Sequence, residues 1–172
     1  MTLYGGPYLN VGNPVSLHEM ERLGLSGAVL TPEGKWQQLS ALSRKSGIRT
    51  GIYAYGRMAV MALRNCPVRA QIGCKNCGGS GKAYLEDRMK ARFPVRCDTA
   101  ETILSPQNKV SYLLNSLPLS MTDRQQELRH YDFALLDFTV ESASEVEKVM
   151  EAWRRRQPLG EYTRGLYTRG VL

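Results

Sequence analysis

Apolar positions in the first third of the chain follow two different periods. Residues 35–46 repeat apolar side chains at helical spacing, and Ser16 precedes Glu19 by three positions, which is the capping-box pattern at a helix start near Leu17. Short apolar runs bounded by Gly, Pro or Asn, which are typical of strands, occur at residues 8–11, 27–31 and 49–55. Strands that alternate with short helices predict βαβ units and a parallel sheet.

The same alternation returns in the last third of the chain. Strands are predicted at residues 110–115 and 133–139, with a helix at 122–131 between them. Ser142 and Glu145 form a second capping-box pattern, which predicts a helix toward Arg156. A closed (β/α)8 barrel needs eight strands and ~250 residues. We therefore expect an α/β chain that is the C-terminal portion, about five strands, of a TIM-like barrel, with a smaller open α/β sheet as the alternative.

The middle of the chain interrupts this pattern. Residues 57–109 are rich in Gly and Cys and show no clear strand–helix rhythm, so they predict an irregular insertion that carries a site. The expected organisation is a single partial barrel domain over 1–172, with the Cys-rich metal-site insertion at 57–109 and a C-terminal tail at 158–172.

All four cysteines lie inside this insertion. Seven residues separate Cys66 from Cys74, two separate Cys74 from Cys77, and nineteen separate Cys77 from Cys97. Four thiolates can enclose one metal centre, and structural zinc usually shows two C-x2-C pairs, whereas this chain has one pair. Pro67 follows Cys66, as proline often follows a cluster ligand. The pattern favours an iron–sulfur cluster over zinc, and buried free thiols are a third interpretation.

The residues around the cysteines suit a metal site. Gly78 and Gly79 follow Cys77, and glycine lets backbone N–H groups approach a sulfur closely. Positive charge beside a thiol favours the thiolate, which is the ligand form. The basic residues of this stretch are Lys75, Lys82, Arg88, Lys90, Arg92 and Arg96.

Composition restricts the class of protein. The chain has 172 residues, of which 42% are hydrophobic and 23% charged, so it is expected to be globular. We expect no membrane segment and no signal peptide, hence a cytoplasmic location where thiols stay reduced; two disulfides in an exported protein is the alternative. The net charge of +7 is compatible with an RNA partner or with a solvated basic surface.

Four polar residues follow or end predicted strands, where barrel enzymes carry their catalytic groups. Asp137 lies within an apolar strand, and a carboxylate there needs a partner; an ordinary ion pair with Arg57 or Arg124 is the alternative to a catalytic role. The candidate catalytic residues are Arg57, Asn115, Asp137 and Glu141. Neither His18 nor His130 stands in a hydrolytic pattern, which weakens a protease interpretation.

Several motifs together resemble one family. They are YGRMAVMALRNCP (55–67), GCKNC (73–77), LEDRMKARFPVRC (85–97), LLNSLPLSM (113–121), LLDFTVES (135–142) and TRGLYTRGV (163–171). From about Tyr4 to its end the chain is similar to the C-terminal half of the collagenase-like peptidase family, peptidase family U-thirty-two. The resemblance implies an eight-stranded barrel and, in some members, a 4Fe–4S cluster on four cysteines, here Cys66, Cys74, Cys77 and Cys97.

The resemblance also implies three functions. Some members are named peptidases, and others are implicated in oxygen-independent hydroxylation of a pyrimidine in transfer or ribosomal RNA, or of the ubiquinone ring. Hydroxylation is the favoured expectation, with Arg88, Lys90 and Arg92 contacting RNA phosphate. A collagenase-like peptidase is the first alternative. The second is a non-enzymatic cluster-bearing or RNA-binding half that needs a partner chain, because the family's N-terminal barrel half is absent here. Leu166 stands where many members have a histidine.

Overall fold

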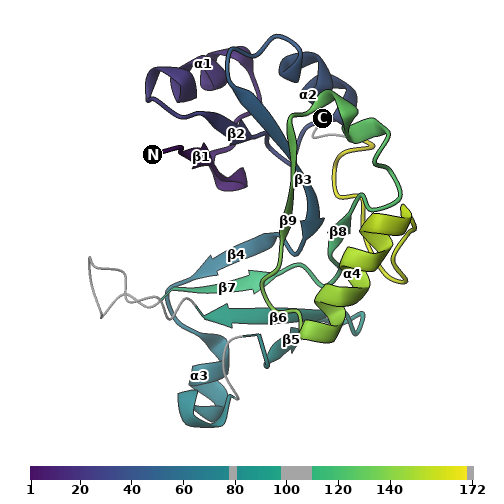
Figure 1. Cartoon of the computed structure of the whole chain (residues 1–172). Coiled ribbons are helices and arrows are strands. Elements are labelled where there is room, and N and C mark those ends of the chain that lie inside the picture. The colour runs from purple at the N-terminus through teal and green to yellow at the C-terminus, as the bar shows by residue number, and fades with distance from the viewer. Residues whose placement is uncertain (78–80, 98–109, 170–172) are drawn as a thin grey trace. The chain divides into compact units, whose positions relative to one another are not determined.

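The computed structural model describes residues 1–77, 81–97 and 110–169 as a mixed α/β structure (Figure 1). The chain divides into two compact units. Unit 1 comprises Met1–Gly56, Leu119–Asp137 and Glu147–Leu172, and unit 2 comprises Arg57–Pro118 and Phe138–Val146. Within the described ranges, no helix is both long enough and apolar enough to cross a bilayer.

Unit 1 is built on a largely parallel sheet. Its strands are β1 (Tyr4–Gly5), β2 (Gly27–Val29), β3 (Arg49–Gly56), β8 (Leu119–Ser120) and β9 (Phe133–Asp137). β1, β2, β3 and β9 are neighbours in that order and run parallel, while β8 pairs antiparallel with the end of β3. Every residue of β3 after Arg49 is buried, which explains its nearly uninterrupted apolar sequence.

Two glycines on this sheet make room for aromatic rings. A Cβ atom on Gly27 would meet the ring of Tyr4, and a Cβ atom on Gly51 would overlap the ring of Phe133. Because both positions lack a side chain, the Tyr4 and Phe133 rings meet edge to face with centroids 5.2 Å apart. Glycine in these strands therefore serves packing rather than flexibility.

The structure confirms most of the helices that capping patterns and apolar spacing predicted. They are α1 (Pro14–Arg22), α2 (Trp36–Ser43), α3 (Pro67–Ile72) and α4 (Ala143–Arg155), with 3-10 turns η1 (Pro7–Leu9), η2 (Cys74–Asn76) and η3 (Glu127–His130). The Ser142 cap is confirmed, because its N–H donates to Glu145 Oε2 at 2.7 Å. The predicted cap of the first helix is wrong by three residues: Asn13 is the N-cap and Ser16 completes the box, while Glu19 pairs with Arg22 at 2.6 Å.

Two predicted elements in unit 1 are wrong. Residues 8–11 are not a strand, because Pro7 starts a 3-10 turn that ends at Asn10 with φ +52°, and only Val11 forms a bridge, to Leu30. Residues 122–131 form only the single turn η3 instead of a helix. There the Thr122 hydroxyl bonds Gln157 O at 2.7 Å, so tertiary contacts override helix propensity.

Unit 2 corrects the expectation of an irregular insertion. It contains an antiparallel sheet in the order β4 (Ala59–Leu63), β7 (Ser111–Leu114), β6 (Arg92–Cys97), β5 (Tyr84–Glu86) (Figure 1). β7 was expected to be a parallel barrel strand, but it pairs antiparallel with both β4 and β6. The described strands form no closed barrel, so the α/β class holds and the parallel sheet is smaller than predicted.

The C-terminal segment packs into unit 1. Tyr167 is fully buried; its hydroxyl donates to Tyr53 O at 2.9 Å, and its carbonyl accepts from Trp36 N at 3.1 Å. Arg164 forms two parallel hydrogen bonds with the Asp123 carboxylate, at 2.8 and 2.7 Å. These contacts join the last described residues to β3 and to the segment after β8.

The Asp123–Arg164 pair gives a pH-dependent prediction. The hydrogen bond from Arg164 lowers the pKa of Asp123, so the pair stabilises the fold above the ordinary pKa of aspartate and loses that effect as pH falls through the lowered pKa. Replacing Asp123→Asn should cost about 2 kcal/mol of unfolding free energy at pH 7, measured by chemical denaturation. The difference in unfolding free energy between Asp123→Asn and the wild-type protein should be smaller at pH 3 than at pH 7. Arg22→Gln, which removes an exposed pair, is the control, and an equal loss in both variants would contradict the prediction.

Candidate metal centre

The antiparallel sheet of unit 2 brings two cysteines to one end. In its register Leu63 of β4 faces Ser111 of β7, and Ser111 faces Cys97 of β6. Cys66 follows Leu63 by three residues, at the start of α3. Cys97 and Cys66 therefore meet around Ser111, which is buried, although they lie far apart in the sequence.

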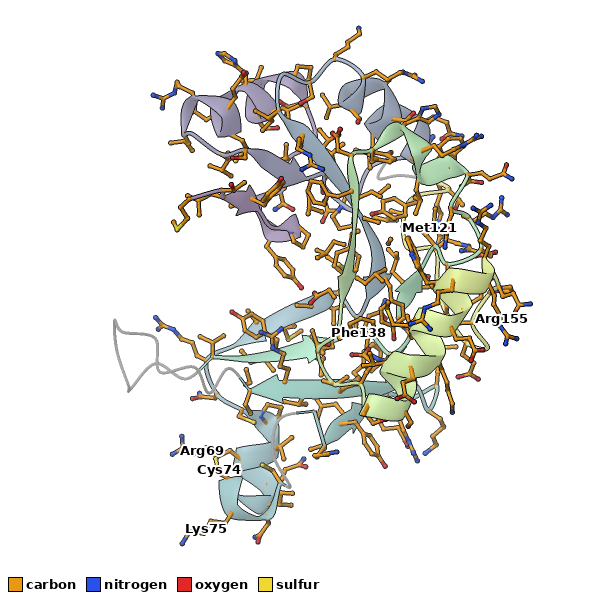
Figure 2. All side chains as sticks on the ribbon, viewed as in Figure 1. Arg69, Cys74, Lys75, Met121, Phe138 and Arg155 are labelled. Carbon is orange, nitrogen blue, oxygen red and sulfur yellow. The ribbon has the colours of Figure 1, made fainter. Side chains whose placement is uncertain are left out.

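The other two cysteines lie on a turn that follows α3. Helix α3 begins at Pro67, which suits the first helical position, and it ends at Gly73 with φ +74°. Glycine adopts this left-handed conformation without strain, and it directs the chain into η2, which starts at Cys74. The Cys77 thiol donates to Cys74 O at 3.2 Å. Figure 2 shows Arg69, Cys74 and Lys75 together on this α3–η2 segment.

The surroundings of Cys66 favour its thiolate. Burial by itself raises the pKa of the Cys66 thiol, whereas hydrogen bonds from the N–H groups of Arg69 and Val68 lower it. The side chains of Cys97 and Ser111 act in the same direction, so the pKa of Cys66 lies below its ordinary value. The first N–H groups of a helix have no acceptor within the helix, so they stabilise a negative charge on a sulfur at the helix start.

The pKa of the Cys97 thiol shifts in the opposite direction. Burial raises the pKa of the Cys97 thiol, and the charge and hydrogen bond of Cys66 raise it further. Charges on Cys77 and Cys74 add to the same effect. Cys97 is therefore within electrostatic reach of the other three cysteines. Four thiols are a donor set that suits a four-thiolate centre by its chemistry.

The thiols do not already have the geometry of a closed centre. In the described part of the chain, no three Cys, His, Asp or Glu side chains are arranged to enclose a metal ion. None of the four cysteines forms a disulfide. Ligation of either a cluster or zinc would require the four side chains to turn toward a common point, as expected when metal binding is coupled to local ordering. Gly78 and Gly79 lie outside the described residues.

Arg57 and Asn115 come together at one end of the β4–β7 pair, and the cysteines lie at the other end. The Arg57 guanidinium Nη1 donates to Asn115 O at 3.0 Å and also to Ser116 O. Asn115 N in turn donates to Met58 O at 2.8 Å. Arg57 thus orders the backbone after β7, and this contact was not visible in the sequence.

Asp137 and Glu141 each accept hydrogen bonds within their own unit. In unit 1, Asp137 Oδ2 accepts from the Tyr53 hydroxyl at 3.2 Å. Of the two arginines considered as its partner, Arg124 pairs with Glu127 at 2.9 Å. In unit 2, Glu141 Oε2 accepts from the backbone N–H groups of Thr139 and Val140 at 2.7 and 3.0 Å. A catalytic role for either carboxylate stays a prediction.

The predicted RNA contacts lie on the hairpin between β5 and β6. Glu86 forms ion pairs with Lys90 at 3.1 Å and with Arg92 at 3.3 Å. The Arg92 guanidinium also lies 4.5 Å from the centre of the Tyr84 ring, a cation–π contact. Arg88 has no carboxylate partner among the described residues, so it is the most available cation of the three.

Sequence reasoning missed the role of Ser111. Its place between Leu63 and Cys97 depends on which strands pair, and a serine in a short strand does not indicate that pairing.

Comparison with protein-family models, with curated proteins and with solved structures finds no match to this chain.

Proposed function

We propose that the chain holds a 4Fe–4S cluster on Cys66, Cys74, Cys77 and Cys97, and that it acts as an oxygen-independent hydroxylation factor on an RNA pyrimidine or a small aromatic ring. The observation that carries the proposal is the placement of the cysteines in unit 2: Cys97 and Cys66 lie at one end of the sheet, and Cys74 and Cys77 lie on the turn that follows α3. The family resemblance of the sequence motifs supports it. When bound, such a cluster supplies single-electron transfer.

The chain's own residues would bind and position the substrate. Arg57 orders the backbone at residues 115–116, which keeps the end of β7 in one conformation. The β5–β6 hairpin offers Arg88, with Lys90 and Arg92 held in place by Glu86, to a phosphate backbone. The net charge of +7 supports an anionic substrate, and a cytoplasmic location suits reduced thiols.

Metal analysis tests the cofactor. Protein purified without oxygen should be brown, with roughly four iron and four sulfide per chain, and Cys97→Ser should lose this absorption. Lys75→Gln, which changes an exposed cation of the same segment and keeps all four thiols, is the control. One tightly bound zinc in a colourless protein would refute the cluster and support the zinc alternative.

Mass spectrometry of RNA tests the reaction. Deletion of the gene in its host should remove one hydroxylated pyrimidine from digested total RNA, and the wild-type gene but not Cys97→Ser should restore it. Loss of a hydroxylated quinone instead would assign the small-aromatic substrate. If neither changes, and purified protein degrades gelatin equally well with Cys97→Ser, the peptidase alternative replaces hydroxylation.

We also infer that unit 1 is the C-terminal part of a TIM-like barrel, completed by a further segment or a partner chain. The supporting observation is strand β1, which among the described strands pairs with β2 alone. Tyr4 of β1 and, shortly after it, Tyr8 and Leu9 are 43%, 56% and 51% exposed, although all three are large and apolar. An edge strand flanked by exposed apolar side chains favours association with another strand.

Sedimentation velocity tests this inference. The isolated chain should form dimers or larger species at micromolar concentration, and Tyr8→Lys with Leu9→Lys should shift it toward monomer because charges at an edge oppose pairing. Val15→Lys, which places a charge on an exposed position of α1, is the control. A wild-type chain that stays monomeric would contradict an uncovered edge.

A further inference from the structure

A recess of about 400 Å³ opens on unit 1 near the C-terminal end of α4. Its lining residues are Gln125, Gln126, Arg129 and Arg156. They supply two guanidinium groups and two amide groups, without a carboxylate. Arg155, labelled in Figure 2, lies on the last turn of α4, next to Arg156 in the chain. This arginine-lined recess has no role in the function proposed above.

The end of α4 fixes the position of Arg156. Arg156 N donates to Trp153 O at 3.3 Å, and Gln157 N donates to Ala152 O at 3.0 Å, which together form a Schellman motif. Arg156 itself adopts φ +56°. Glycine is usual at this left-handed position, and a longer side chain there is strained. The chain therefore keeps an arginine where helix termination alone favours glycine.

Hydrogen bonds join the two walls of the recess. The Gln125 side-chain amide donates to Trp153 O, on α4. Thr122, which is fully buried, donates its hydroxyl to Gln157 O at 2.7 Å. The segment that carries Arg129 and the helix end that precedes Arg156 are thus tied together within unit 1, so the backbone that carries both arginines is already in place before a ligand binds.

The arginines of this region fall into two groups. Arg124 pairs with Glu127 at 2.9 Å, and Arg155 pairs with Glu151 at 2.7 Å, so these charges are already balanced. Arg129 and Arg156 have no carboxylate partner within the described residues, and both line the recess. Arg129 uses its Nε–H to bond Gln126 O at 3.1 Å. Its terminal N–H groups remain as donors for a ligand.

The helix dipole explains only part of this arrangement. Basic side chains near a helix C-terminus are favourable, and Arg154 and Arg155 satisfy that preference within the last turn. It accounts neither for a strained arginine beyond the last turn nor for the approach of Arg129 from a separate segment. Two guanidinium groups that line one recess, without carboxylate partners among the described residues, match an anion with several acceptor oxygens.

We propose that the arginine-lined recess binds a phosphate group, through Arg129 from the segment after β8 and Arg156 from the end of α4. The phosphate can belong to an RNA backbone or to a small phosphorylated molecule, since both present the same oxygens. The proposal concerns binding alone and does not depend on hydroxylation or on the cluster.

Titration of the full chain with inorganic phosphate, followed by calorimetry, tests the proposal. Arg156→Gly and Arg129→Gln should each weaken phosphate binding about tenfold, the loss expected for one charge-assisted contact. Arg156→Gly should also leave the melting temperature unchanged or raise it, because glycine relieves the left-handed strain. Arg155→Gln removes the same net charge from an ion pair outside the recess, and it should leave phosphate binding unchanged.

A second titration with a single-stranded RNA octamer separates the two sources of phosphate. A parallel loss of RNA affinity in Arg156→Gly and Arg129→Gln assigns the site to RNA, whereas a loss for inorganic phosphate alone assigns it to a small molecule. The proposal is overturned if the wild-type chain does not bind phosphate. It is also overturned if Arg155→Gln weakens binding as much as Arg156→Gly, since net charge alone would then be responsible.

Discussion

The pairing of β7 with both β4 and β6 is the constraint on which the candidate metal centre depends. This register aligns Leu63, Ser111 and Cys97 across the sheet, and it brings the start of α3 to the same end. The thiol of Cys66 is then near Cys97 and beside the first N–H groups of α3, which lower its pKa. Without the register, Cys97 would not lie near Cys66.

Unit 1 depends on a different set of contacts, which come from its C-terminal segment. The Tyr167 hydroxyl donates to Tyr53 O on β3, and Arg164 forms two hydrogen bonds with the Asp123 carboxylate. Because Asp123 and Thr122 make these tertiary contacts, the residues that follow them do not continue as a helix. The same local conformation turns Gln125 and Arg129 toward the recess near the end of α4.

Some basic side chains of the described residues have carboxylate partners, and others have none. Lys90 and Arg92 on the β5–β6 hairpin share Glu86, and Arg124 and Arg155 have carboxylate partners of their own. A surface ion pair contributes little stability, generally less than about 1 kcal/mol, but it determines which cations remain available. A net charge of +7 therefore matters less than the location of the few unbalanced guanidinium groups.

The sequence by itself determined the elements whose signals are local. Ser142 and Glu145 cap α4 as predicted, and β3 and β9 follow their apolar runs, because capping and strand formation depend on neighbours in the chain. The spacing of the four cysteines also led to the expectation of a metal centre, which stays a prediction. Tertiary structure decided the rest: β4 and β6 belong to an antiparallel sheet because β7 pairs with both, and Arg129 and Arg156 line one recess although they come from distant segments. Strand pairing and side-chain charge balance are long-range properties, so no pattern within one stretch of residues predicts them.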